Sequence, residues 1–177
     1  NIIYDAAGEV GALHTAESVV AYAEKLLAEG LPAGIMLIPD GWQSHSSELL
    51  FDAESYPAPA DMVTQLHRLG FKVMLSVSPY IPAVGREFVR NRDAGALLLD
   101  EKGEIVLFNT ESGFMACRVP DMDTALRYSG EMRSLMNSYG IDGFRVDATL
   151  LEGRLSGEAL DNFYSAWAAV GADIPMM

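Results

Sequence analysis

The chain has 177 residues, half of them hydrophobic, a composition typical of one globular domain that removes roughly 70% of its unfolded surface from water. Its net charge of −13 argues against binding to nucleic acid or to anionic membranes, because phosphate groups would be repelled. A single cysteine, Cys117, excludes an internal disulfide bond, and no apolar run reaches the length of about 18 residues that a membrane span needs.

A helical stretch, a glycine that ends it and an apolar strand follow one another repeatedly along the chain. In the first helix, Val19 and Leu26 follow helical spacing between an N-cap at Thr15 and a stop at Gly30. Asp123 is the predicted cap of a later helix. The predicted helices cover 15–30, 60–70, 84–95, 123–140 and 157–171, and the predicted strands cover 1–5, 33–42, 71–80 and 139–148.

Residues 96–109 are predicted to form a hairpin that turns at Lys102–Gly103. The remaining order, βαβαβαβα with continuous apolar strands, predicts a parallel sheet covered by helices. Either an open doubly wound sheet or part of a (β/α)8 barrel fits this order. No glycine-rich phosphate loop follows the first strand, which argues against a nucleotide-binding fold. The final residues, 171–177, resemble the start of another strand.

Polar and aromatic residues follow three of the apolar strands at their carboxyl ends, where barrels and open α/β sheets place their chemistry. Aromatic rings can stack on a sugar, and carboxylates can accept its hydroxyls or attack its anomeric carbon. Arg145 lies two residues before Asp147 and would keep that carboxylate ionised. The candidate site residues are Asp40, Trp42, Tyr80, Arg145 and Asp147.

Each candidate also has a structural interpretation. Asp40 can belong to an ordinary Asp-Gly turn, Trp42 to the core, and Arg145 with Asp147 to a structural ion pair. The three histidines lack the mutual spacing of metal ligands, and Cys117 has no CxxC partner, so we expect neither a metal site nor a nucleophilic thiol. No cofactor is expected.

Four segments, 30–43, 51–81, 97–109 and 139–148, resemble in order and spacing the catalytic barrel of glycoside hydrolase family 31, which comprises retaining α-glucosidases, α-xylosidases and relatives. The resemblance spans about 11–148. It implies that 1–177 is a single partial catalytic domain of TIM type with about the first four βα units.

The resemblance also implies roles for the candidate residues. The aromatic-Lys-x-Asp pattern of the family's fourth strand reads Phe144-Arg145-Val146-Asp147 here, so Asp147 would be the nucleophile and Arg145 would replace the substrate-contacting Lys. Asp40 with Trp42 matches the second-strand motif, and Tyr80 lies in the third-strand motif. All four companions of Asp147 would bind substrate.

Several positions depart from the family pattern. Pro39 stands where many relatives carry an Asp, and Glu152 is the nearest counterpart of a Glu that commonly follows the nucleophile. The Asp-Gly-Trp-Gln motif also resembles the α-galactosidase clan. The family's acid/base comes from a later strand, so we expect this chain to lack it. Four strands leave two unpaired edges, which predicts pairing with a missing half-barrel or self-association.

The expected function is therefore retaining hydrolysis of α-linked glycosides, with a carbohydrate substrate and neither nucleic acid nor membrane as partner. An inactive sugar-binding or scaffolding relative and an α-galactosidase-like enzyme remain alternatives. An aldolase or isomerase would need a lysine at a strand end or a phosphate-binding loop, and the sequence shows neither. The sequence leaves the sugar and the compartment open; with no signal pattern in its first residues, the cytoplasm is slightly favoured.

Overall fold

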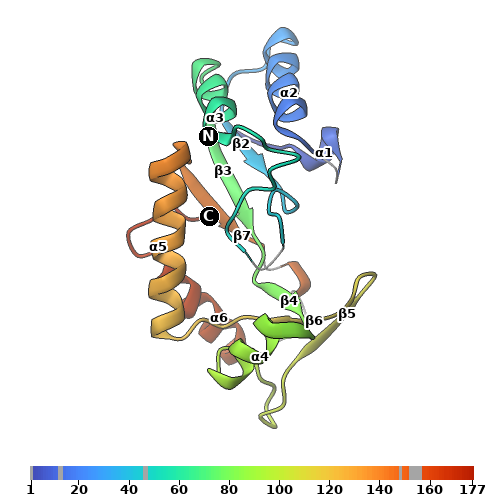
Figure 1. Ribbon diagram of the computed structural model, residues 1–177, viewed down its shortest axis with the longest axis vertical. Coiled ribbons are helices and arrows are strands. Elements are labelled where there is room, and N and C mark those ends of the chain that lie inside the picture. The colour runs from blue at the N-terminus through green and yellow to red at the C-terminus, as the bar shows by residue number, and fades with distance from the viewer. Residues whose placement is uncertain (1, 12–13, 46–47, 148, 152–156) are drawn as a thin grey trace. The chain divides into compact units, whose positions relative to one another are not determined.

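The computed structural model describes residues 2–11, 14–45, 48–147, 149–151 and 157–177 (Figure 1). Helices alternate with strands through most of the chain. In order, the elements are β1 (Ile3–Asp5), α1 (Ala7–Val10), α2 (Ala16–Ala28), β2 (Ile35–Ile38), α3 (Pro59–Arg68), β3 (Lys72–Val77), β4 (Tyr80–Pro82), α4 (Gly85–Asp93), β5 (Leu107–Thr110), β6 (Gly113–Cys117), α5 (Met122–Tyr139), β7 (Gly143–Val146), the 3₁₀ turn η1 (Thr149–Leu151) and α6 (Gly157–Val170).

The main sheet is parallel, and its strand order β1-β2-β3-β7 follows the order of these strands in the chain. The end of the chain extends it: the Phe144 N–H donates to the Pro175 carbonyl at 2.9 Å, and Phe144 forms a parallel bridge with Met176. A doubly wound sheet would reverse its strand order at a switch point, whereas a barrel adds each strand beside the previous one. The order therefore decides between the two predicted architectures: the chain forms part of a TIM-type barrel.

The sheet is also curved. Arg145 on β7 reaches Asp5 at the end of β1 with 3.5 Å between Nη1 and Oδ2, although β2 and β3 lie between these strands. In a flat sheet the two backbones would be about 14 Å apart, three strand spacings. Curvature towards the Arg145 side of the sheet shortens this span, as barrel closure requires.

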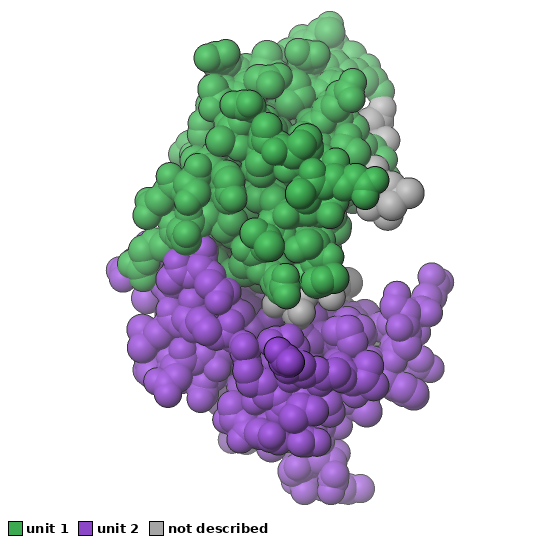
Figure 2. Space-filling model, viewed as in Figure 1, with its two compact units in different colours: residues 1–77, 132–145, 175–177 green, residues 78–131, 146–174 purple. Residues whose placement is uncertain are grey.

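Contacts divide the chain into two compact units (Figure 2). Unit 1 comprises residues 1–77, 132–145 and 175–177, and unit 2 comprises 78–131 and 146–174. The core of unit 1 is formed by buried apolar residues of α2, β2 and α3, namely Val19, Ala23, Leu26, Met36, Leu37, Ile38, Met62, Val63 and Leu66. In unit 2, a cluster of Ile81, Leu97 and Ala116 packs against Phe88 and Ile105.

Helix boundaries follow local capping chemistry. Thr15 caps α2 as predicted: its hydroxyl accepts the Ser18 N–H at 3.2 Å, and the Ser18 hydroxyl accepts the Thr15 N–H at 2.8 Å. The predicted cap of α5 is wrong, because Asp123 lies inside the helix. Asp121 does the capping, accepting the Thr124 N–H at 2.9 Å, and the hydrogen bonds from Thr124 hold its pKa below the usual value.

A second sheet, with strand order β4-β6-β5, is antiparallel throughout. The turn at Lys102–Gly103 is present, with Leu99 bridged to Ile105. The longer hairpin, however, joins β5 to β6 through residues 111–112 and lies mostly outside the predicted range 96–109. Its two strands are short, and no Asn-Gly or Asp-Gly pair marks its turn, which explains why the sequence did not reveal it.

Gly143 on β7 occupies a position where any side chain would collide with the end of the chain. A Cβ placed there would lie 2.6 Å from the Pro175 carbonyl oxygen and 3.0 Å from the Met74 methyl carbon. We expect Gly143→Ala to lower the free energy of unfolding by about 1–3 kcal/mol through overpacking, measured by chemical denaturation of the full-length protein.

Gly130, inside α5, provides the matched control for this substitution. A Cβ there meets no atom within 4 Å, and alanine is the better helix former, so Gly130→Ala should stabilise by about 0.5–1 kcal/mol. Equal effects of the two substitutions would contradict the close approach of β7 and residues 175–177.

Candidate active site

Asp40, the predicted substrate-binding carboxylate of unit 1, is exposed and directly follows β2 and the buried Pro39. His14 holds the loop after β2 by a hydrogen bond to its backbone. Its Nε2 donates to the Asp40 carbonyl at 3.1 Å, so its Nδ1 accepts from the hydroxyl of Tyr56. Burial raises the pKa of Tyr56, which keeps that hydroxyl protonated as a donor.

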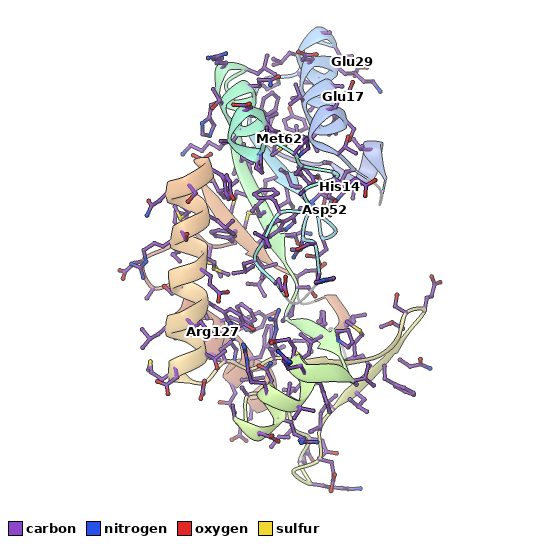
Figure 3. All side chains as sticks on the ribbon, viewed as in Figure 1. His14, Glu17, Glu29, Asp52, Met62 and Arg127 are labelled. Atoms are coloured by element: carbon purple, nitrogen blue, oxygen red, sulfur yellow. The ribbon has the colours of Figure 1, made fainter. Side chains whose placement is uncertain are left out.

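Only 2% of His14 is exposed, and its two partners identify it as a structural residue of the loop that carries Asp40. Figure 3 labels His14 and Asp52, and Tyr56 connects the two, since its backbone N–H donates to the Asp52 carbonyl at 2.8 Å. The sequence argued against a metal-binding role for His14, but an isolated histidine gave no signal that it holds the loop carrying Asp40.

Trp42 is fully buried. Its indole N–H donates to the Ser76 carbonyl at 2.7 Å, and its ring packs on Phe51 with 4.8 Å between centroids. A ring that stacks on a sugar needs an exposed face, so these contacts favour the core interpretation of Trp42, tying the loop after β2 to β3.

Arg145 projects from β7 and is ion-paired with Asp5, whose other carboxylate oxygen accepts the Ala7 N–H at 2.9 Å. The Arg145 side chain is 31% exposed, so the pair contributes little to stability. Its Nε, by contrast, is buried and has no hydrogen-bond partner among the residues that the structure describes. Within unit 1, Asp40 and Arg145 thus lie at the carboxyl ends of β2 and β7, strands of one parallel sheet.

Asp147, the predicted nucleophile, directly follows β7 and is half-buried in unit 2. Tyr80, in the same unit, is 5% exposed and packs edge-on against Phe108, with 5.7 Å between ring centroids. Burial, followed by electrostatic interactions with Cys117 and Asp147, raises the pKa of Tyr80. Unit 2 therefore brings these two predicted site residues into electrostatic contact.

Arg118 is a site residue that sequence reasoning missed. It is 3% exposed, and its guanidinium donates to the carbonyls of Ser78 and Pro79 and to the hydroxyl of Tyr128. Its backbone N–H donates to Pro79 as well, at 2.8 Å. These bonds fix the two residues that precede Tyr80. An arginine after an apolar strand gave no sequence signal of these contacts, because the two carbonyls that it binds lie about 40 residues away.

Three buried side-chain atoms lack a hydrogen-bond partner within the described part of the chain: Ser76 Oγ, Tyr80 Oη and Arg145 Nε. They belong to β3, β4 and β7, and two of the three residues are predicted site residues. Buried polar groups without a partner are rare and call for an explanation such as a ligand or a catalytic role.

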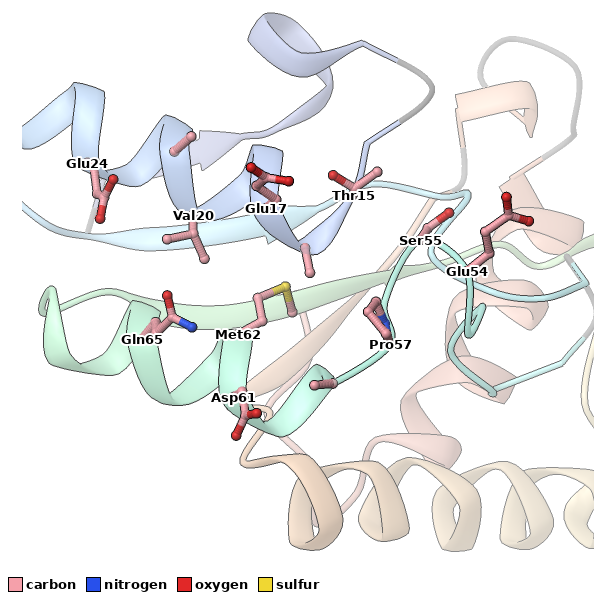
Figure 4. A pocket seen from close by; sticks show the side chains of 13 residues that line it. Thr15, Glu17, Val20, Glu24, Glu54, Ser55, Pro57, Asp61, Met62 and Gln65 are labelled. Atoms are coloured by element: carbon pink, nitrogen blue, oxygen red, sulfur yellow. The ribbon is translucent and has the colours of Figure 1, made fainter.

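A cavity of about 720 Å³ opens elsewhere in unit 1, between α2, α3 and the preceding loop (Figure 4). Glu17, Glu24, Glu54 and Asp61 line it, and none of the five candidate residues does. No group of three or more His, Cys, Asp or Glu in the described residues could hold a metal ion, and no described helix is long and apolar enough to cross a membrane. Glu152 lies outside the described residues.

The model of the glycosyl hydrolases family 31 TIM-barrel domain matches residues 7–166. The chain belongs to glycoside hydrolase family 31. An α-xylosidase, XylQ, from Lactiplantibacillus pentosus is 24% identical over 139 residues, which is 76% of this chain and 18% of that protein. The family resemblance carried by the strand-end motifs is thereby confirmed.

Solved structures share the fold of this chain. A GH31 dextranase from Flavobacterium johnsoniae, complexed with glucose, has a TM-score of 0.69 and 19% identity over 90% of this chain and 22% of its own. An α-galactosidase from Thermus thermophilus has a TM-score of 0.75 and 14% identity over 98% of this chain and 36% of its own. The chain thus spans about a third or less of the length of these relatives.

Proposed function

We propose that this chain belongs to a retaining α-glycosidase in which Asp147 is the nucleophile. The observation that carries the proposal is the match of the family 31 barrel over 7–166 together with the Phe144-Arg145-Val146-Asp147 sequence, whose Asp directly follows a barrel strand. Barrel enzymes place catalytic residues at the carboxyl ends of strands, which is where Asp147 lies.

In the proposed reaction, a carboxylate oxygen of Asp147 attacks the anomeric carbon while the bond to the leaving-group oxygen breaks and an acid protonates that oxygen. Water then hydrolyses the glycosyl ester and restores the carboxylate. The acid and the Asp147 carboxyl must lie about 5–5.5 Å apart. We assign that acid to a residue outside 1–177, in keeping with the small share of its relatives' length that this chain spans.

We propose that Asp40 and Arg145 of unit 1 contact the sugar, the role that the family resemblance implies for each of them. Asp40 is exposed and can accept sugar hydroxyls, and the Arg145 Nε, which has no hydrogen-bond partner among the described residues, can donate to one. Trp42 is buried and fixes the loop that carries Asp40.

Product stereochemistry tests the reaction class. The full-length protein is offered aryl α-glycosides of xylose, glucose and galactose, and the first-formed sugar is followed by proton NMR. We expect one of the three to be cleaved with initial release of the α-anomer, because two displacements at the anomeric carbon restore its configuration. Initial release of the β-anomer would contradict the proposal, and binding without turnover of any sugar would favour the inactive sugar-binding relative.

A further inference from the structure

The hydroxyl of Tyr80 is buried without a hydrogen-bond partner in the described residues, on a ring whose position is fixed. Tyr80 pairs with Cys117 in the antiparallel sheet, and its ring packs edge-on against Phe108. A buried hydroxyl that makes no hydrogen bond destabilises the fold, because it loses its bonds to water without replacement. Retaining such a group, where Phe would fill the same space, implies a use for its oxygen or its proton.

The backbone of Tyr80 is also held in place. Its N–H donates to the Ser78 hydroxyl at 3.1 Å, and the Arg118 guanidinium donates to the carbonyls of Ser78 and Pro79. The phenol therefore cannot relax towards another partner by a shift of its own strand. Any partner has to come from the groups that already face the hydroxyl.

Those groups belong to Asp147 and to the turn directly after it. The backbone N–H groups of Leu150 and Leu151, in η1, face the Tyr80 oxygen and lower its pKa, while the charge of Asp147 raises it. Burial outweighs the amides, so the phenol stays protonated at neutral pH. Burial also raises the pKa of the nearby Cys117 thiol, to about 12, and keeps it neutral. The two amides can only donate to the phenol, whereas the carboxylate can only accept from it.

We propose that Tyr80 is a positioning residue for the nucleophile: in the substrate complex its O–H donates to one carboxylate oxygen of Asp147 while its oxygen accepts from the amides of η1. This hydrogen bond would hold Asp147 in one rotamer and leave the second carboxylate oxygen to attack the sugar. The proposal rests on the nucleophile role proposed for Asp147. It replaces the stacking role expected of Tyr80, because a ring that is 5% exposed offers no face to a sugar.

Tyr80→Phe in the full-length protein tests the proposal. Because the hydroxyl has no hydrogen-bond partner among the described residues of the free chain, its removal should leave Tm unchanged or slightly higher. We expect kcat to fall about 10–100-fold with KM within about threefold of wild type, as for a misoriented catalytic group. The rate constant for trapping Asp147 with a fluorinated glycosyl fluoride should fall by the same factor.

Tyr4→Phe is the matched control. Tyr4 is a buried tyrosine of β1 whose hydroxyl donates to the Pro32 carbonyl at 2.8 Å, in the segment that precedes β2. Its substitution should lower Tm and leave kcat and KM unchanged. The two variants thus have opposite expected patterns in stability and in activity, which separates positioning from a merely structural role.

Two results would overturn the positioning role of Tyr80 without affecting the proposed function. One is an unchanged kcat and trapping rate in Tyr80→Phe; the other is a raised KM with unchanged kcat, which would make Tyr80 a substrate contact. In both cases wild type is still trapped on Asp147, so the proposed function stands. Absence of trapping on Asp147 in an active wild-type protein would overturn both proposals.

Discussion

Replacing Asp147 with Ala is expected to lower kcat of the full-length protein by at least about 10⁴-fold, the effect of removing a nucleophile that forms the covalent intermediate. The side chain is half-buried and directly follows β7, so the smaller residue should be tolerated by the fold. Steady-state rates on an aryl α-glycoside that wild type cleaves, with Tm measured in parallel, check the expectation.

Added azide sharpens this test. A small anion can enter the space vacated by the Asp147 carboxylate and attack the anomeric carbon once, so Asp147→Ala should regain activity and release a β-glycosyl azide. Asp93→Asn is the control: Asp93 is exposed and forms a surface ion pair with its neighbour Arg92 on α4, so its loss should leave kcat unchanged. A fully active Asp147→Ala variant would contradict the assignment.

The second large effect is on stability. Arg118→Met keeps an unbranched chain in the core of unit 2 but removes the guanidinium, which donates to the carbonyls of Ser78 and Pro79 and to the Tyr128 hydroxyl; only the backbone N–H to Pro79 is kept. Each buried carbonyl left without a partner costs about 1–3 kcal/mol, and relief of the buried charge offsets part of that cost. We expect the free energy of unfolding to fall by about 2–4 kcal/mol.

Denaturant unfolding and hydrogen exchange check this prediction, with faster exchange expected in residues 78–82. Arg92→Met is the control, because the Arg92 side chain is 48% exposed and its pair with Asp93 lies at the surface; we expect a change within about 0.5 kcal/mol. If Arg118→Met and Arg92→Met lower the free energy of unfolding by the same amount, Arg118 is not the residue that fixes the segment before Tyr80.

Local chemistry made the helices predictable. Thr15, the apolar spacing after it and Gly30 define α2 within one or two residues, because a cap and a stop are properties of neighbouring residues. The cap of α5 was misassigned because Asp121 and Asp123 are both good caps, and only the backbone geometry selects the first.

Contacts between distant residues were not predictable in the same way. Nothing local to Trp42 or Arg118 indicates that they bond the carbonyls of Ser76 and Ser78, about 35–40 residues away. The choice between an open sheet and a barrel likewise depended on which strands pair. That choice became visible only in the order β1-β2-β3-β7 and in the bridge from Phe144 to Met176.

The candidate site falls between these cases. Strand-end positions of Asp40, Tyr80, Arg145 and Asp147 follow from the βα rhythm, since each apolar run has to end in something polar. Their partners did not follow: the ion pair of Arg145 with Asp5 joins strands that are three places apart in the sheet, and the amides facing Tyr80 come from a turn without a sequence signal.

The most direct measurement is to map the covalent intermediate. The full-length protein is inactivated with a fluorinated glycosyl fluoride of the sugar that it cleaves, digested, and sequenced by tandem mass spectrometry. We predict one added sugar, on Asp147. A sugar on a different carboxylate, or turnover that leaves no trapped ester, would contradict the assignment of the nucleophile.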